Sequence, residues 1–204
     1  GIDLPTENKG NVPEERYYNR YYGQDRWNAM TVRSLAIGQG ELGVTPLQLA
    51  NYSAVVANRG FYYVPHLVKE IEGGNIASEF RQKVEIDISK NHYEPVIDGM
   101  QQVVEQTNAS VFMKIPEITM CGKTGTAENP HGEDHSIFMA FAPKDDPQIA
   151  ISVYVENSGY GAVWAAPIAS LLVEKYLNDS VANSRKWVER RMLDANLLNP
   201  NQSE

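Results

Sequence analysis

The chain has 204 residues, of which 42% are hydrophobic and 22% charged, and its formal net charge is −8. This length suits one domain better than two, and the composition supplies enough apolar material for a core. The acidic balance without any basic run excludes a nucleic-acid partner, and apolar runs such as 168–173 are far shorter than the roughly 18 residues that span a bilayer.

The first predicted element is a short helix over residues 11–22. Asn11 with Glu14 three residues on is typical of a helix start, Pro13 fits the first turn, and Gly23 is a typical stop. Four tyrosines follow at helical spacing: Tyr17, Tyr18, Tyr21 and Tyr22. We interpret this stripe as a packing surface in preference to a platform for a ligand.

The next helix has the clearest start signal. Thr45 is a natural N-cap, Pro46 suits the first helical position, and Gln48 completes a capping box. This helix is expected to end near Gly60. The preceding Ile-Gly-Gln-Gly segment, 37–40, matches neither GxGxxG nor GxxxxGK[ST], so we interpret it as a turn in preference to a phosphate cradle.

Two short strands are predicted at 67–71 and 84–88, on either side of a turn at Gly73 and Gly74. An amphipathic helix follows over 95–106. Its apolar face is expected to contain Val96, Met100, Val103 and Val104.

Three strands in series are predicted next, at 118–126, 136–142 and 148–156, the last two forming a hairpin around 143–147. In the last strand an alternating set of side chains is expected to face the core: Ile149, Ile151, Val153 and Val155. Because neighbouring strands usually pair, we expect three consecutive antiparallel strands of one sheet, with a helix over 165–176 packed on it.

The single cysteine, Cys121, excludes an internal disulfide bond and lies in the first of these three strands. We interpret it as a small buried side chain in preference to a reactive thiol. A final, charged helix is predicted over 184–196. Helices, then three strands in series, then helices again indicate the α+β class, with an antiparallel sheet flanked by helices.

The segment that carries chemistry is Lys123-Thr124-Gly125-Thr126, here named the KTGT segment. It offers an ammonium group, two hydroxyls and a glycine that lets another chain approach the backbone. These groups suit a ligand that carries a carboxylate and lies extended along a strand. Lys-Thr-Gly, with Ser-x-x-Lys and Ser-Asp-Asn, is the signature of penicillin-binding proteins and class A β-lactamases.

Further segments bring the resemblance closer to class B penicillin-binding proteins. The similar segments are 1–7, 37–40 with 44–50, and the hairpin residues 138–143 with 146–150. Their order resembles the penicillin-binding protein 2 group, the peptidoglycan D,D-transpeptidases. The resemblance implies that residues 1–178 are the C-terminal part of a β-lactamase/transpeptidase-like domain, and that 179–204 form a tail with the charged helix.

The sequence departs from the family at the nucleophile. No serine has a lysine three residues on, so the Ser-x-x-Lys motif is not found. Ser-x-Asn is matched only by Ser89-Lys90-Asn91, which we attribute to chance because it follows the Thr-Pro-Leu-Gln segment instead of preceding it. We therefore expect the N-terminal half of the domain, with the nucleophile and general base, to be absent from this sequence, and this fragment alone to be inactive.

The resemblance implies a role for each residue of the KTGT segment. Lys123 would supply positive potential for the substrate carboxylate and the proton network. Thr124 and Thr126 would hydrogen-bond the carboxylate of a D-alanine terminus or of a β-lactam, and Gly125 would permit close strand approach. The backbone N–H of Thr126 would be one of two oxyanion-hole donors.

The implied activity of the parent protein is D,D-transpeptidation, in which a serine is acylated by a stem peptide or by penicillin, without a metal or organic cofactor. A D,D-carboxypeptidase or serine β-lactamase is an alternative, and so is a non-catalytic β-lactam sensor or scaffold on the same fold. The implied location is the periplasmic face of the inner membrane, through an N-terminal anchor absent here. Elongation-machinery membrane proteins are the implied partners.

Other polar residues are given lesser roles. His131 and His135 could form a metal cluster with the acidic residues between them, but a solvated loop is favoured because no helix sets their spacing. His66 and His92 are isolated in the sequence. Glu128 directly follows the KTGT segment and is assigned to the rim of the site, without a catalytic role.

Overall fold

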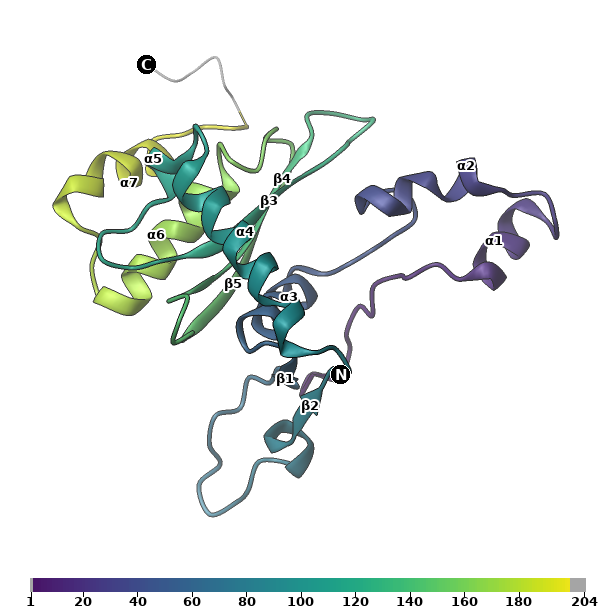
Figure 1. Cartoon of the computed structure of the whole chain (residues 1–204), viewed down its shortest axis with the longest axis horizontal. Coiled ribbons are helices and arrows are strands. Elements are labelled where there is room, and N and C mark those ends of the chain that lie inside the picture. The colour runs from purple at the N-terminus through teal and green to yellow at the C-terminus, as the bar shows by residue number, and fades with distance from the viewer. Residues whose placement is uncertain (1, 199–204) are drawn as a thin grey trace.

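The computed structural model describes residues 2–198; Gly1 of the opening segment and 199–204 of the expected tail lie outside the described residues. A three-stranded sheet is covered by helices, and an arm and a small two-stranded sheet extend from this body (Figure 1). The helices are α1 (Glu15–Tyr22), α2 (Ala29–Val32), α3 (Pro46–Ala57), α4 (Glu94–Gln106), α5 (Ser110–Met113), α6 (Ala165–Asn178) and α7 (Lys186–Leu193). The strands are β1 (Phe61–Tyr63), β2 (Lys83–Glu85), β3 (Cys121–Ala127), β4 (His135–Ala142) and β5 (Ile149–Val155).

The main sheet has the order β3-β4-β5, and both pairs are antiparallel. Gly125 lies opposite Ile137, and Phe138 lies opposite Val153. This confirms the three consecutive strands predicted from the sequence. The first strand begins at Cys121, three residues later than predicted, because Ile118 forms an isolated bridge with Ile115.

One face of the sheet packs against α6, as predicted. Phe138 and Ala140 of β4 share a buried cluster with Ala169 and Val173 of α6. Small side chains let the helix approach the sheet closely, and burial of this apolar surface stabilises the pair. The predicted alternating set of β5 packs against the same cluster: Ile149, Ile151, Val153 and Val155.

The other face is covered by α3 and α4. Val56 of α3 and Ile97 of α4 pack with Cys121 and Phe141 of the sheet. The α4 helix confirms the predicted bounds to within one residue, but Val96 is 49% exposed and does not belong to its buried face. The buried face follows the spacing 97, 100 and 104, so Ile97 takes the place that the sequence pattern gave to Val96.

Capping explains why α3 was predicted accurately. The Thr45 hydroxyl accepts a hydrogen bond from the Gln48 backbone N–H at 3.2 Å, and Gln48 Oε1 accepts one from the Thr45 N–H at 2.8 Å. Pro46 occupies the first turn. These reciprocal bonds satisfy two amide groups that a helix start otherwise leaves without partners.

One predicted element was placed too early at its start, and another was wrong. The first helix begins at Glu15, not at residue 11, because Asn11 exchanges two backbone hydrogen bonds with Gly43. Residues 67–71 form no strand; the N–H groups of Leu67 and Val68 donate instead to the Asp3 carboxylate. The partner of the predicted second strand is β1, which pairs with β2 in antiparallel register.

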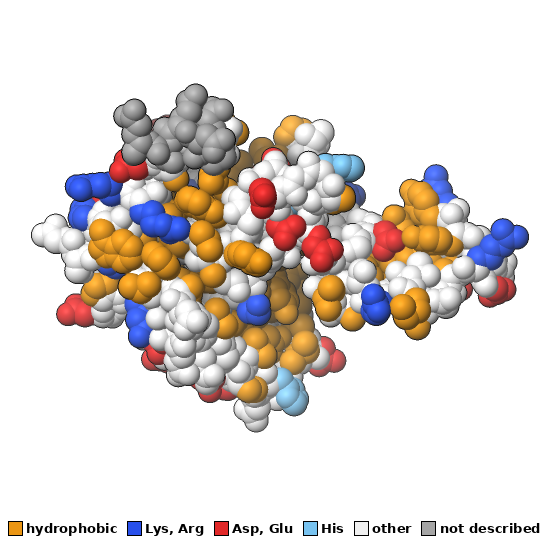
Figure 2. All heavy atoms as spheres, turned by 90° about the horizontal axis from the view of Figure 1, so that it is seen from above, with side chains coloured by type: hydrophobic (Ala, Val, Ile, Leu, Met, Phe, Trp, Pro, Cys, Tyr) orange, Lys and Arg blue, Asp and Glu red, His pale blue; other side chains and the backbone are white. Residues whose placement is uncertain are grey.

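The arm consists of α1, α2 and the 3₁₀ helix η1 (Arg33–Ile37), and it projects from the body (Figure 1). Hydrophobic side chains lie on its surface (Figure 2). Tyr18 is buried against Trp27, with ring centroids 5.2 Å apart, and its hydroxyl donates to Glu41, so this tyrosine packs as predicted. No helix among residues 2–198 is long and apolar enough to cross a membrane.

Candidate active site

The KTGT segment lies on an edge strand. Within the part of the chain that the structure describes, β3 pairs with β4 alone, so its second edge has no strand partner. Successive residues of a strand direct their backbone groups to opposite edges, so residues two apart share an edge. Such an edge is a template on which an extended peptide can add as a further strand.

Two side chains mark this open edge. Lys123 Nζ donates to the carbonyl of Thr124 at 2.7 Å, and Gln39 Nε2 donates to the carbonyl of Thr126 at 3.4 Å. These two carbonyls belong to alternate residues and face the same edge, and the N–H group of each residue points the same way as its carbonyl. The Thr126 N–H is therefore directed to the edge where a ligand can reach it.

The two glycines of β3 differ in what surrounds them. A Cβ on Gly122 would lie 2.2 Å from Cζ of the buried Phe138, so packing alone requires glycine there. A Cβ on Gly125 would meet its nearest neighbour, Ile137, at 3.4 Å, close to ordinary van der Waals contact. Internal packing at that face therefore leaves room for a Cβ at Gly125, in contrast to Gly122.

Gln39 is a site residue that the sequence interpretation missed. Its segment was correctly interpreted as a turn, since Gly38 has φ 77° at the end of η1 and Gly40 has φ 72°. Between these glycines Gln39 reaches the KTGT segment, 87 residues further along the chain. The signal that could have found it was the similarity of 37–40 to a family segment.

Polar side chains in the loop between β3 and β4 are joined by hydrogen bonds. The Asn129 amide donates to Asn157 at 2.6 Å, and its backbone N–H donates to Asp134 at 3.2 Å. His135 does not lie in the loop as expected: it begins β4, its Nδ1 accepts from the Asn157 N–H, and its ring packs on Tyr154. Among residues 2–198, no group of three His, Cys, Asp or Glu side chains is arranged to hold a metal ion.

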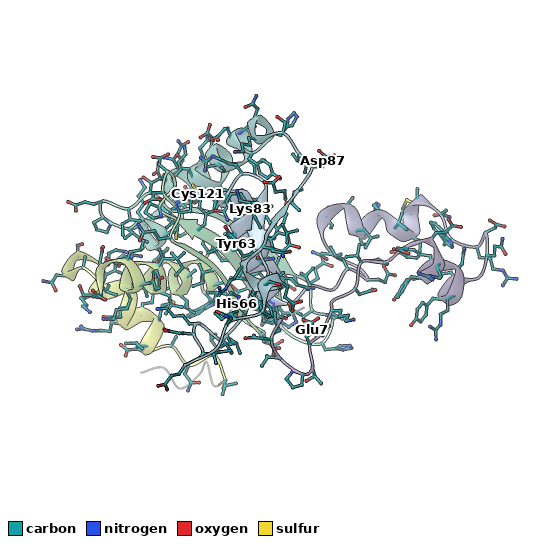
Figure 3. All side chains as sticks on the ribbon, turned by 90° about the horizontal axis from the view of Figure 1, so that it is seen from below. Glu7, Tyr63, His66, Lys83, Asp87 and Cys121 are labelled. Carbon is teal, nitrogen blue, oxygen red and sulfur yellow. The ribbon has the colours of Figure 1, made fainter. Side chains whose placement is uncertain are left out.

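The remaining candidate residues lie apart from this edge. Ser89, Lys90 and Asn91 are exposed where the chain leads into α4. His66 contacts the Phe80 ring, and in the view of Figure 3 it is labelled well apart from Cys121 of β3. No hydrogen bond joins a serine hydroxyl to a lysine among the described residues.

Comparison with known proteins fits this architecture. The family model of the penicillin binding protein transpeptidase domain matches residues 1–174. The chain belongs to this family. Its relatives are those of the class B penicillin-binding protein 2 group, which confirms the resemblance seen in the sequence.

Three relatives illustrate the extent of the match. The peptidoglycan D,D-transpeptidase MrdA of Haemophilus influenzae is 30% identical over 207 residues, covering 92% of this chain and 32% of that protein. The imipenem acyl-enzyme of Mycobacterium tuberculosis penicillin-binding protein A is 31% identical with a TM-score of 0.61, covering 71% of this chain and 33% of that one. The Helicobacter pylori PBP2–MreC complex is 26% identical with a TM-score of 0.69, covering 87% and 32%. The chain thus spans about a third of the length of these relatives.

Proposed function

We propose that this chain supplies the substrate-binding strand of a peptidoglycan D,D-transpeptidase, which cross-links stem peptides through a serine acyl-enzyme and binds penicillin. The observation that carries the proposal is the placement of the KTGT segment on a sheet edge that no strand among residues 2–198 pairs, with the Thr126 N–H directed outward. An extended peptide ending in a carboxylate is the ligand that suits this edge.

Each residue of the segment has a role in this proposal. The Lys123 ammonium attracts the substrate carboxylate; it has three donors, so it can keep its bond to Thr124 while it does so. The hydroxyls of Thr124 and Thr126 hydrogen-bond the carboxylate. The Thr126 N–H stabilises the oxyanion that forms when the acyl carbonyl is attacked, and Gly125 gives the ligand access to the backbone.

The nucleophile is not one of the serines of this sequence, because none has the Ser-x-x-Lys spacing. Two buried serines hold the fold instead: Ser136 bonds the backbone of Tyr160 and Ala165, and Ser170 bonds the carbonyl of Phe112. We propose that 1–178 form the C-terminal part of the transpeptidase domain and that the acylated serine lies outside this sequence.

Relatives support the ligand and partner classes of the proposal. The Mycobacterium tuberculosis relative forms an acyl-enzyme with imipenem, and the Helicobacter pylori relative assembles with MreC. We propose the same classes here: β-lactams, peptidoglycan stem peptides, and membrane proteins of the elongation machinery. The proposed location is the periplasmic face of the inner membrane.

Labelling with a fluorescent penicillin tests this function. The full-length protein should take one label, on a serine outside residues 1–204, and the 204-residue chain alone should take none. Stoichiometric labelling of a serine within this chain would contradict the proposal. A folded full-length protein that takes no label would favour a non-catalytic scaffold, and an acyl-enzyme that passes its acyl group only to water would favour a carboxypeptidase or β-lactamase.

A further inference from the structure

The loop of residues 158–164, named here the β5–α6 loop, is fixed against the hairpin that carries the site. The N–H groups of Ser158 and Gly159 donate to the carbonyl of Asp134 at 2.9 and 2.7 Å. The buried Ser136 hydroxyl donates to the Tyr160 carbonyl at 3.1 Å and accepts from the N–H that begins α6. The loop therefore follows any movement of β4 and its neighbours.

Within this loop, Gly161 lies directly against the KTGT segment. A Cβ on Gly161 would lie 2.4 Å from the carbonyl oxygen of Gly125 and 2.3 Å from that of Ile137. Real Cβ atoms do not approach oxygen this closely, so the backbones of the loop and of β3 are in direct contact. Because close-packed backbone transmits displacement, a shift of the loop becomes a shift of Gly125 and of the Thr126 N–H beside it.

The outer side of the loop is held by the C-terminal helix. Arg191 of α7 donates from Nη1 to the carbonyl of Val163 at 3.1 Å. Its guanidinium lies 5.1 Å from the ring centroid of Trp164 and 4.8 Å from that of Phe112. A planar cation that contacts two aromatic rings, with a donor left for a carbonyl, is an arrangement that arginine provides and lysine does not.

Helix α7 is itself anchored in the body. The buried Arg185 pairs with Glu174 of α6 at 2.5 Å and donates to Ser170 at 2.7 Å and to the Phe112 carbonyl at 3.1 Å. Val188 of α7 is fully buried. Figure 1 shows α5, α6 and α7 gathered on one side of the sheet. The position of Arg191 is thus set by α6 and α5 and not by the loop that it contacts.

We propose that Arg191 is a positioning residue for the KTGT strand: it braces the β5–α6 loop at Val163 and Trp164, and the loop holds Gly125 and the Thr126 N–H in place through Gly161. The expected effect on acylation rests on the proposed function. The contact of Arg191 with the β5–α6 loop is a property of the fold and does not depend on that function. The C-terminal helix, which lies beyond the 1–174 family match, then contributes to the geometry of the site.

The test compares three variants in the full-length protein. Arg191→Met removes the charge and the donor but keeps the aliphatic stem, Arg191→Lys keeps the cation, and Arg190→Met is the matched control, because Arg190 is exposed on the same helix. Hydrogen–deuterium exchange is measured on peptides covering 123–127 and 158–164, together with the acylation rate constant for a fluorescent penicillin.

Arg191→Met should speed exchange in both segments and slow acylation roughly three- to tenfold. A displacement of the Thr126 N–H by less than an ångström should slow the reaction less than the roughly hundredfold expected for a full ångström. The exchange and acylation rates of Arg191→Lys should lie between those of Arg191→Met and the wild type. Arg190→Met should change neither rate. Unchanged exchange at 123–127 in Arg191→Met would overturn the proposal; if that variant does not fold, unchanged exchange in Arg191→Lys would do so. A wild-type protein that takes no penicillin label would refute the proposed function. The exchange result would still decide whether Arg191 positions the β5–α6 loop and the KTGT segment.

Discussion

Gln39 donates a hydrogen bond from Nε2 to the backbone carbonyl of Thr126, 3.4 Å away and on the edge that a substrate strand would use. The Gln39 backbone is fixed, because its N–H donates to the Ser34 carbonyl at 2.9 Å and the glycines on either side adopt positive φ. A carbonyl oxygen has two lone pairs, so a ligand N–H and Gln39 can share it. The segment 37–40 thus contributes an uncharged donor beside the edge that receives an anionic ligand.

Replacing that donor with a charge should weaken the site. In Gln39→Glu the carboxylate faces the Thr126 carbonyl and repels the carboxylate of the incoming penicillin. We expect acylation of the full-length protein to slow about fivefold, corresponding to about 1 kcal/mol, with Gln39→Ala in between. Gln24→Glu, an exposed position on the arm, is the control for the change in net charge. The Gln39→Glu defect should shrink at high salt, and a defect equal to that of Gln24→Glu would contradict the expectation.

Two glycine substitutions separate packing from backbone flexibility. Gly122→Ala places a methyl group 2.2 Å from the Phe138 ring, which is fully buried and cannot turn away. We expect a loss of about 1–3 kcal/mol in the free energy of unfolding, measured with urea. Gly99→Ala is the matched change, because a Cβ there meets nothing within 4 Å on the exposed face of α4. It should stabilise the chain by about 0.5–1 kcal/mol, and equal effects at the two sites would contradict the packing account.

The thiol of Cys121 should be unreactive in the folded protein. Burial raises the pKa of its thiol from an ordinary value of 9.0 to about 12. At pH 8 the folded thiol is therefore protonated, and it should not react with a disulfide reagent until the chain is unfolded. Rapid labelling of the native chain would contradict this.

The same shift predicts a dependence of stability on pH. Because the folded pKa of Cys121 lies above that of the unfolded thiol, the unfolded state loses its proton first as pH rises. The contribution of this group to the free energy of unfolding should be constant below about pH 8 and fall between about pH 9 and 12. Cys121→Ala is the control, because all other titrating groups remain, and a difference between the two proteins that does not change with pH would contradict the assignment.

Local signals in the sequence predicted the elements that local physics controls. The capping box at Thr45 and Gln48 gave the start of α3, and the alternation of side chains along β5 gave the sheet face that packs on α6. The start of α1 failed because Asn11 pairs with Gly43, a partner 32 residues away that competes with helix capping. The strand predicted at residues 67–71 was wrong because the Asp3 carboxylate accepts hydrogen bonds from backbone N–H groups that a strand would pair.

The candidate site also contains both residues that local sequence predicts and contacts that only the fold creates. The KTGT segment could be found because its chemistry lies in four adjacent residues. The contacts of Gln39 with Thr126 and of Gly161 with Gly125 could not, because each joins segments that are distant in sequence and is created only by the fold. Spacing along a chain carries no information on such contacts unless a family resemblance marks both segments.

Loss of the Lys123 charge should produce the largest functional effect. Lys123 is exposed on β3, and within residues 2–198 its ammonium bonds only the carbonyl of its neighbour Thr124, so its removal leaves the core intact. If the ammonium makes a charge-assisted contact to the substrate carboxylate, Lys123→Ala should cost about 1.5–3 kcal/mol of transition-state stabilisation. That cost corresponds to acylation by penicillin roughly 10- to 200-fold slower, and stopped-flow labelling of the full-length protein measures it.

The ranking of variants decides whether the KTGT assignment holds. Thr126→Val should be less damaging than Lys123→Ala, because the backbone N–H survives and only the hydroxyl is lost. His131→Ala, in the exposed loop, should change the rate by less than about twofold. His135→Ala is a less direct control than its loop position suggested, because His135 Nδ1 holds the N–H of Asn157, but it too should remain well above Lys123→Ala in rate. A Lys123→Ala protein that folds and acylates normally would refute the assignment, since no other cation of the KTGT segment could replace the charge.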